Sequence, residues 1–330
     1  MRLDIADFDP PFHWSVNPQA EAAHRRSITW LRCFGVITDE ESATRHLAER
    51  WGLWGGVAWP MGDAEGLQLG VDLPSLWTVL DTRLSGDRNH DELLDSLRHA
   101  IVRPGDPGPI PVARALADLW SRQRRRACAV SQALLERSEH HWLEWIDACA
   151  AEADSQRRAD LRTCSLSDYD ALRDVTGVMQ VIYTFDEAIG GYEVPSPARH
   201  LAPGTPLGAM RQAATRYIDY LNDLTSLPKE EADGETLNGV LVLQQQDRCS
   251  REAAIAEVRR MLRSHLDRFL AEESTLPDYC AAHGLDLGDR RAVYRTVAGM
   301  RNIISAVYMI SVHSGRWALT PENGQAGSAL

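Results

Sequence analysis

Apolar side chains recur every three to four positions along most of this chain, the spacing that places them on one face of an α-helix. Glycines and prolines separate these stretches, and no run alternates apolar and polar residues long enough to predict a strand. The sequence therefore predicts an all-α protein. After a helix that starts near Gln19 and runs to Cys33, long helices are expected at 67–84, 89–102, 110–136, 138–160, 167–189, 205–227, 236–247, 250–271 and 287–315.

Two stretches near the N-terminus depart from this run of long helices. Residues 1–17 are predicted to be irregular, because prolines interrupt them. A short helix is expected after a cap at Thr38 or Asp39, and its buried face is predicted to carry three residues at a four-residue spacing: Ala43, Leu47 and Trp51. A turn at Gly55-Gly56 is expected to follow.

Length and composition allow one large domain. The chain has 330 residues, 44% of them hydrophobic, and neither a linker nor an internal repeat divides it, so one domain over residues 1–330 is expected. No run of about 18 apolar residues predicts a membrane span. The first residues lack the basic-then-apolar order of a secretory signal, so a cytoplasmic location is expected. Six cysteines without a C-x-x-C pair are interpreted as reduced, mostly buried thiols.

The formal net charge of −12 argues against nucleic acid or an anionic membrane as a partner. A local basic run, Arg122 with Arg124, Arg125 and Arg126, is interpreted as a solvated helix face rather than a binding patch. If the substrate is a polyanion such as a diphosphate, an acidic protein needs divalent cations and a few well-placed arginine or lysine side chains to hold it.

One stretch concentrates groups that can bind a metal ion. On a helix, Ser226 lies ~40° and Glu230 ~80° around the axis from Asn222, so an amide oxygen, a hydroxyl and a carboxylate share one face. Asn222 and Glu230 are ~12 Å apart along the axis, and the glutamate side chain leans back to shorten that gap. Such oxygen donors suit Mg²⁺, and Lys229 beside them can hold an anion bridging to the metal. The alternative is an ordinary solvated helix face.

This stretch closely resembles the second metal-binding motif of class I terpene cyclases, N-D-x-x-S-x-x-x-E with a basic residue before the glutamate. It reads Asn222-Asp-Leu-Thr-Ser-Leu-Pro-Lys-Glu230. Pro228 departs from the pattern, because it removes a helical N–H inside the motif and can kink the helix. The resemblance to bacterial members extends over essentially the whole chain and includes the pair Trp59-Pro60.

The family's first metal motif, D-D-x-x-D or D-D-x-x-E, is degenerate here. The resemblance places Asp81 at its first acid, with Thr82 and Ser85 where two further acids stand in the family. Asp81 is therefore the expected metal ligand of this motif, with Asp87 as a further candidate. The alternative is that Asp81 is merely an acid at a helix end. Trp77 lies one helical turn before Asp81 and is expected to face the substrate.

The remaining site residues follow from the same resemblance. Arg173 is implied to sense a substrate diphosphate, Thr176 to act as a linker and Gly177 to present its carbonyl to the forming cation. The alternative is a surface arginine and a packing glycine, although a glycine inside a predicted helix often marks a break or a close backbone approach. Arg316 and Trp317 resemble a C-terminal Arg-Tyr pair, with tryptophan in place of tyrosine, and are implied to contact diphosphate.

The resemblance implies a single class I terpenoid-synthase-like helical bundle with a central apolar pocket, metals at its mouth and a mobile tail at 318–330. The implied activity is Mg²⁺-dependent ionisation of a prenyl diphosphate, of farnesyl or geranylgeranyl type, and cyclisation of the carbocation. Three Mg²⁺ ions are implied, and a homodimer is left open. Aromatic faces such as that of Trp77 are expected to stabilise the cation by ~0.5–2 kcal/mol each.

Two other classes were weighed against a cyclase. A chain-elongating prenyl transferase would use two Asp-rich motifs, and the intact Asn/Ser/Glu motif argues against it. A non-catalytic or repurposed relative that binds a prenyl or pre-cyclised diphosphate stays open, because the first motif has lost acids. His140 and His141 are adjacent, so a helix is expected to point them apart, and they are interpreted as non-ligands.

Overall fold

Helices account for the regular structure of the chain. This computed structural model describes residues 5–86, 90–157, 164–234 and 237–315, and no strand occurs in those ranges, so the all-α prediction is confirmed. In chain order the elements are η1 (Ala6–Phe8), α1 (Ala20–Cys33), α2 (Glu40–Ala48), α3 (Trp51–Ala58), α4 (Ala64–Gly86), α5 (His90–Val102), α6 (Pro111–Val130), α7 (Gln132–Arg157), α8 (Leu166–Thr176), α9 (Met179–Gly190), α10 (Pro197–His200), α11 (Pro206–Asp233), α12 (Gly239–Asp247), α13 (Arg251–Ala282) and α14 (Leu287–His313).

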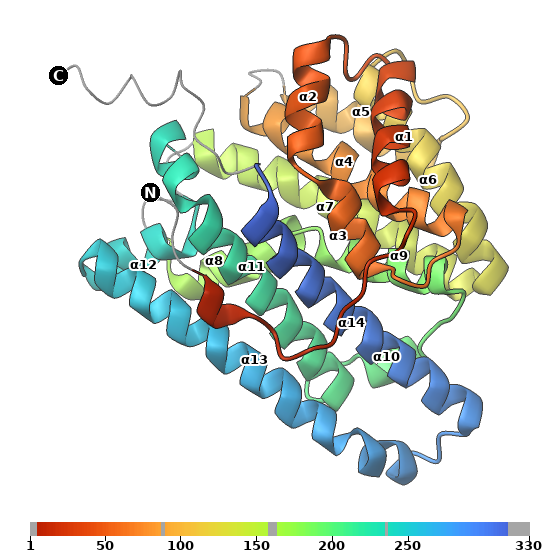
Figure 1. Cartoon of the computed structure of the whole chain (residues 1–330), viewed down its shortest axis with the longest axis vertical. Coiled ribbons are helices and arrows are strands. Elements are labelled where there is room, and N and C mark those ends of the chain that lie inside the picture. Colours follow the sequence, from red (N-terminus) through yellow and green to blue (C-terminus); the bar gives the residue numbers. More distant parts are fainter. Residues whose placement is uncertain (1–4, 87–89, 158–163, 235–236, 316–330) are drawn as a thin grey trace.

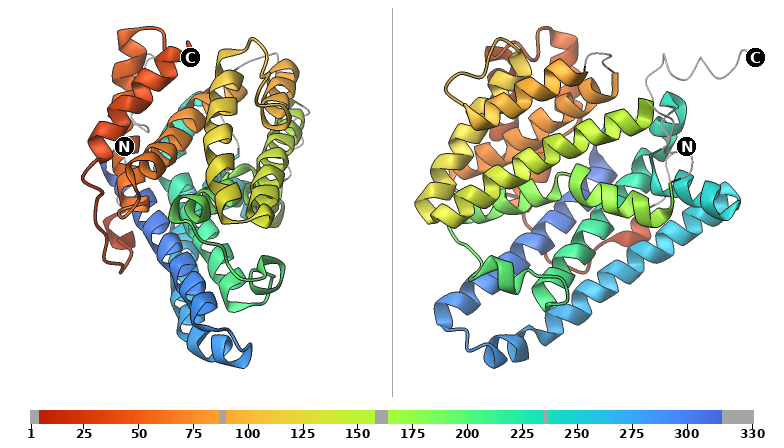
Figure 2. Two further views of the ribbon diagram at one scale, coloured as in Figure 1. Left: turned by 90° about the vertical axis from the view of Figure 1, so that its right-hand side faces the viewer. Right: turned by 180° about the vertical axis from the view of Figure 1, so that it is seen from behind.

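The long helices form a bundle around shared apolar side chains. Helices α11, α13 and α14 lie side by side in the lower half of Figure 1, and α1 and α4 to α7 gather in its upper right. The turned views in Figure 2 show the same two groups of helices meeting. Most buried apolar residues from Ile5 to Ile310 make one continuous cluster, and Ala23, Leu67 and Val71 form a small second one. Their removal from water is the main stabilising term of the fold. None of the described helices combines the length and apolar character needed to cross a membrane.

Helix α11 carries the predicted metal motif and runs further than its sequence pattern indicates. Thr205 caps its start by accepting a hydrogen bond from the Gly208 N–H (3.1 Å), and Gly234, with φ +75°, ends it. Pro228 lies inside the helix, so the predicted end at residue 227 is wrong. Leu227, fully buried, anchors this part of α11 in the apolar cluster. Tertiary packing thus outweighs the local preference of proline to end a helix.

The predicted helix 167–189 is two helices, α8 and α9, separated by Gly177 and Val178. A Cβ at position 177 would lie 2.7 Å from the Arg173 carbonyl oxygen and 3.0 Å from Asp219 Oδ1, so both a break and a close approach occur where the glycine indicated them. Val178 has φ +60°, which is rare for a β-branched residue and stores ~1–3 kcal/mol of strain.

Two helix boundaries differ from the sequence expectation because tertiary contacts set them. Helix α6 ends at Val130 and α7 begins at Gln132, not between residues 136 and 138. Ser131 is extended at the junction, where its hydroxyl accepts the Leu134 N–H (2.9 Å) and donates to the Glu193 carboxylate. Helix α13 continues to Ala282, past the expected end at 271.

The N-terminal helices also differ in detail. Asp39 caps α2 by accepting the Ser42 N–H (2.7 Å), as expected. Leu47 is 40% exposed, and Trp51 begins α3, so the predicted common face on α2 is wrong. The cause is a chain reversal at Arg50, which has φ +60°. The expected turn at Gly55-Gly56 is wrong as well, since both glycines lie inside α3.

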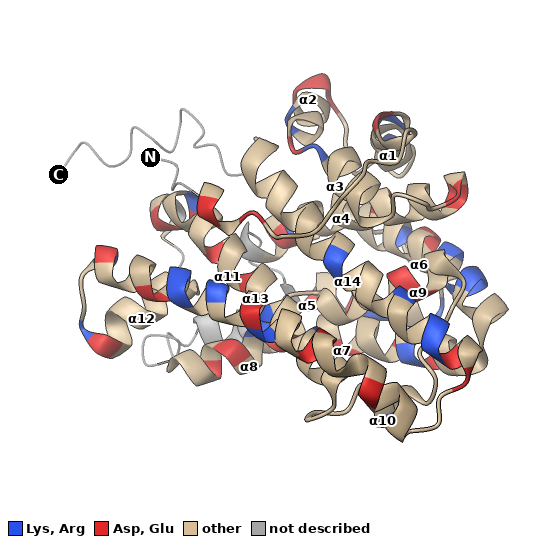
Figure 3. Cartoon of the chain, turned by 60° about the horizontal axis from the view of Figure 1, so that its bottom comes forward, with Lys and Arg blue, Asp and Glu red and all other residues tan. Residues whose placement is uncertain are grey.

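Two interpretations of surface chemistry need correction. Arg124 and Arg125 are exposed, as expected for a solvated helix face. Arg122 is instead ion-paired with Asp72 (2.7 Å), and Arg126 with Asp63 (2.8 Å), so these two reach from α6 across to the N-terminal part of the bundle. Acidic and basic residues are interspersed along the helices, as the red and blue segments in Figure 3 show. All six cysteines are free thiols, but Cys280 is the one that is buried, so the expectation of mostly buried thiols is wrong.

Candidate functional site

A mostly apolar cavity of about 90 Å³ lies between α3, α4, α8, α9, α11 and α14. Three tryptophans, Trp51, Trp54 and Trp77, form its aromatic wall. The polar part of the wall is made by Arg173, Asp219 and Asn222, and the break between α8 and α9 completes it through Gly177 and Val178. The expected central apolar pocket is therefore present, and Trp77, Arg173, Gly177 and Asn222 all reach it.

The motif on α11 brings oxygen donors together. Ser226 is buried and donates to the Asn222 carbonyl oxygen (2.8 Å), so its own oxygen keeps lone pairs for a metal ion. The Glu230 carboxylate accepts a hydrogen bond from Asn238 Nδ2 (2.8 Å). Burial, together with the negative charge of Asp223, raises the pKa of Glu230 to about 7, and the hydrogen bond from Asn238 opposes this shift.

This donor set fits a hard divalent cation. An amide oxygen, a hydroxyl and a carboxylate are ligands that Mg²⁺ accepts. Asp223 adds a second buried carboxylate, which accepts the Tyr169 hydroxyl (2.7 Å) and the Gly239 N–H (3.0 Å). Burial raises the pKa of Asp223 to about 6. The ionised forms of buried Asp223 and half-buried Glu230 are both disfavoured, and the positive charge of a bound cation would stabilise them. Lys229 is half-buried next to Glu230.

The first metal motif lies on the last turns of α4. Asp81 is half-buried, one turn after Trp77, which lines the cavity. Thr82 is exposed, and its hydroxyl donates to the Thr78 carbonyl of the same helix (3.0 Å). Asp87 and the side chain of Ser85 lie outside the described residues.

Arg173 projects from α8 toward α11. Its Nη2 donates to Asn222 Oδ1 (3.4 Å) and lies 3.9 Å from Asp219 Oδ1. Thr176, at the end of α8, accepts the indole N–H of Trp145 on its carbonyl oxygen (3.1 Å). The structure thus connects the predicted residues of α8 with the motif on α11. Arg316, Trp317 and the tail 318–330 lie outside the described residues.

Sequence reasoning missed Asp219 and Asn238. Asp219 is 3% exposed and lies between Arg173 and Arg216. Burial raises its pKa to about 6, although the two guanidinium groups oppose the shift. Asp219 lies one helical turn before Asn222, and this spacing could have predicted that its side chain lies at the same site. Asn238 caps α12 and also donates to the Asp223 carbonyl oxygen (2.9 Å), a contact that no local pattern announces.

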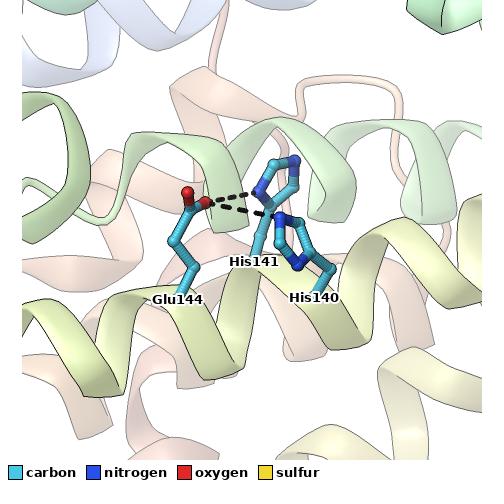
Figure 4. Close-up of side chains that lie close together, drawn as sticks. All are labelled: His140, His141 and Glu144. Carbon is cyan, nitrogen blue, oxygen red and sulfur yellow. Dashed lines mark hydrogen bonds and ion pairs between the residues drawn. The ribbon is translucent and has the colours of Figure 1, made fainter.

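The histidine pair on α7 lies apart from this cavity. Figure 4 shows His140 and His141 both turned toward Glu144, with the His141 Nδ1 at 3.2 Å and the His140 Nε2 at 4.0 Å from its carboxylate. The expectation that the helix points the two rings apart is therefore wrong. Burial lowers the pKa of His141 to about 4, although Glu144 opposes the shift, and Arg211 lowers the pKa further. The same arginine charge would repel a metal ion here, and the interpretation as non-ligands stays a prediction.

Known proteins resemble this chain over most of its length. The family model for terpene synthase family 2, C-terminal metal binding, matches residues 79–268. A pentalenene synthase of Streptomyces arenae is 31% identical over 318 residues, which covers 94% of this chain and 92% of that protein. A (-)-beta-caryophyllene synthase of Saccharothrix espanaensis, described as (2E,6E)-farnesyl diphosphate cyclizing, is 31% identical over 287 residues, with 85% and 78% covered. The solved structure of an a-eudesmol synthase superposes with a TM-score of 0.82 at 23% identity and covers 96% of this chain and 100% of that one.

Proposed function

This chain belongs to terpene synthase family 2, and from that premise we propose that it ionises farnesyl diphosphate and cyclises the resulting carbocation. Membership makes it a class I terpene cyclase, and the comparisons lend no support to a non-catalytic relative. The farnesyl chain length is our proposal. It is supported by a relative whose name specifies farnesyl diphosphate.

The observation that carries the proposal is the composition of the cavity wall. Three tryptophans contribute to the apolar part of the lining, and Arg173 and Asn222 contribute to the polar part. An isoprenoid chain matches the apolar side, and its diphosphate matches the polar one. A water-poor, aromatic wall stabilises a carbocation through cation–π contacts and protects it from capture by water.

We assign metal binding to Asn222, Ser226 and Glu230 on α11 and to Asp81 on α4. Mg²⁺ is the proposed ion because oxygen donors predominate. The proposed number of three ions follows from the family resemblance. When bound, these ions supply the positive charge that stabilises the departing diphosphate. Within the chain, Asn238 orients the Glu230 carboxylate through its 2.8 Å hydrogen bond.

The remaining roles follow from the cavity. Arg173 and Lys229 are proposed to donate hydrogen bonds to the diphosphate, which is charge-assisted binding. Arg316 and Trp317 are proposed to join them, although both lie outside the described residues. Trp77 is proposed to face the cation. Gly177 is proposed to present its carbonyl dipole to the cation, with Thr176 linking it to Arg173.

Three expectations about the whole protein also remain proposals: one domain over residues 1–330, a cytoplasmic location and a homodimer. The continuous apolar cluster of the described residues supports the first.

Incubation with farnesyl and geranylgeranyl diphosphate and Mg²⁺, followed by product analysis, tests the function. We expect cyclic C15 products from farnesyl diphosphate. Glu230→Gln should lower turnover by about 100-fold or more at saturating Mg²⁺, because the carboxylate ligand is lost. The matched control is Glu231→Gln, whose carboxylate is exposed and pairs with Arg251 (2.7 Å), and it should keep wild-type turnover. Equal losses in both variants, or wild-type turnover in Glu230→Gln, would contradict the assignment.

A further inference from the structure

Asp219 contacts both the proposed diphosphate sensor and the helix break, and we propose that it is the positioning residue that couples Arg173 to the break between α8 and α9. The inference rests on the proposed function, in which Arg173 receives the diphosphate. It goes further, because it names the group through which this contact reaches the backbone that shapes the cavity.

The carboxylate of Asp219 joins two parts of α8. Its Oδ1 lies 3.9 Å from Arg173 Nη2, and it would lie 3.0 Å from a Cβ at position 177. The Gly177 N–H in turn donates to the Arg173 carbonyl oxygen (2.9 Å), as the last hydrogen bond of α8. Arg173, Asp219 and Gly177 therefore lie next to one another in the cavity wall.

Asp219 is buried but loosely held. Its Oδ2 lies 3.6 Å from Arg216 Nη1, and neither atom has a hydrogen-bond partner in the described parts of the chain. By contrast, Arg216 Nη2 is fixed to Asp174 Oδ2 at 2.7 Å. A carboxylate that has left water depends on the cations beside it. Its orientation therefore follows the position of Arg173.

The consequence reaches the cavity through the break. When Arg173 turns to a diphosphate, the Asp219 carboxylate loses one of the two guanidinium groups beside it and reorients. Gly177 is in contact with it and shifts in turn. Val178 is next to it in a strained backbone conformation with φ +60°, so a small shift there changes the wall that faces the isoprenoid chain.

Asp219→Asn tests the proposal, because it keeps the size of the side chain and removes the charge. We expect turnover of farnesyl diphosphate to fall about 100-fold, with KM changed less than about threefold, and the product mixture to shift toward acyclic or incompletely cyclised compounds. Asp174→Asn is the matched control. It removes the carboxylate closest to Arg216 and leaves the Arg216–Asp170 ion pair (3.5 Å), Arg173 and Gly177 in place, and it should keep the wild-type product mixture.

A second measurement reads the coupling directly. Hydrogen exchange of the peptide over residues 172–182 is compared with and without inorganic diphosphate and Mg²⁺. In the wild type we expect diphosphate and Mg²⁺ to change the hydrogen-exchange rate of this peptide. In Asp219→Asn we expect diphosphate still to bind, but without that change in exchange rate. If Asp219→Asn matches the wild type in both exchange and products, the coupling role is wrong and the proposed function stands. If the wild type neither binds diphosphate nor converts farnesyl diphosphate, both are overturned.

Discussion

Four carboxyl groups that folding removes from water have pKa values well above those of the same groups in solution. Burial raises the pKa of Asp186 to about 7, of Asp219 to about 6, of Asp223 to about 6 and of Glu230 to about 7. Three of them surround the proposed metal and diphosphate site, where positive charge would offset their cost. Asp186 lies elsewhere, held by the Tyr192 hydroxyl (2.5 Å) and the Trp59 indole N–H (3.1 Å).

Asp186 therefore gives a pH dependence of stability that is independent of the active site. Its pKa rises from 3.8 to about 7 on folding, so the native state holds a proton that the unfolded chain has lost. This contribution is complete below about pH 4 and disappears as the pH rises through about 7. Asp186→Asn should thus gain stability over the wild type on going from about pH 5 to about pH 8, on the order of 2 kcal/mol in chemical denaturation.

The control for this prediction is Asp63, whose contribution to stability has the opposite pH dependence. Hydrogen bonds from Arg126 and from the Gly66 N–H lower the pKa of Asp63, so its ionised form stabilises the fold, and that stability is lost as the pH falls. Asp63→Asn should lose stability relative to the wild type at about pH 8. The same pH trend in both variants would contradict the assignment of Asp186.

At the scale of elements, glycines let α3 approach its neighbours closely. A Cβ at Gly52 would lie 2.7 Å from the Ala20 carbonyl oxygen of α1, and one at Gly55 would lie 2.5 Å from the Val71 side chain of α4. Trp51 and Trp54 on the same helix line the cavity. The close approach at these glycines therefore determines how near the Trp51 and Trp54 side chains lie to the rest of the cavity wall.

Gly52→Ala separates packing from helix propensity. Alanine favours a helix by ~1 kcal/mol over glycine, but here its Cβ overlaps backbone that cannot move aside, which costs ~1–3 kcal/mol or more. We expect a net loss of stability in thermal and chemical unfolding. Gly288→Ala, in the first turn of α14, meets only Asp286 Oδ1 at 3.3 Å and should be neutral or stabilising. A stabilising Gly52→Ala would show that α3 can move away from α1.

At the scale of the whole molecule, one cavity joins six helices of the bundle. Residues of α3, α4, α8, α9, α11 and α14 line it, so a change in how these helices pack changes the space for the substrate. The break between α8 and α9 borders the same cavity.

Mg²⁺ together with inorganic diphosphate should stabilise the whole fold, because the pair binds the native state alone. At 100 times its dissociation constant a ligand adds about 2.7 kcal/mol, which for a chain of this size raises the melting temperature by roughly 5 °C. Thermal denaturation measures the rise, and either component alone should produce much less. Glu230→Gln should lose most of the effect and Glu231→Gln should keep it. A full rise in Glu230→Gln would place the binding site elsewhere.

The sequence by itself determined the helical class, the shared face of Asn222, Ser226 and Glu230, and the glycine at the break in the predicted helix 167–189. These features are local, because helical periodicity and a helix-disfavouring residue act within one or two turns. The family resemblance rested on the same local strings. The cap at Asp39 was predictable for the same reason.

Only the tertiary structure decided the rest. The helix end at Ser131, the continuation of α11 through Pro228 and the place of Asp219 beside Arg173 all depend on contacts between residues distant in sequence. Such contacts leave no periodic trace along the chain, yet they determine whether a proline ends a helix and whether a carboxylate is solvated or buried. Their energies exceed the ~1 kcal/mol scale of local preferences, and for that reason the structure and not the pattern fixed the charge network of the site.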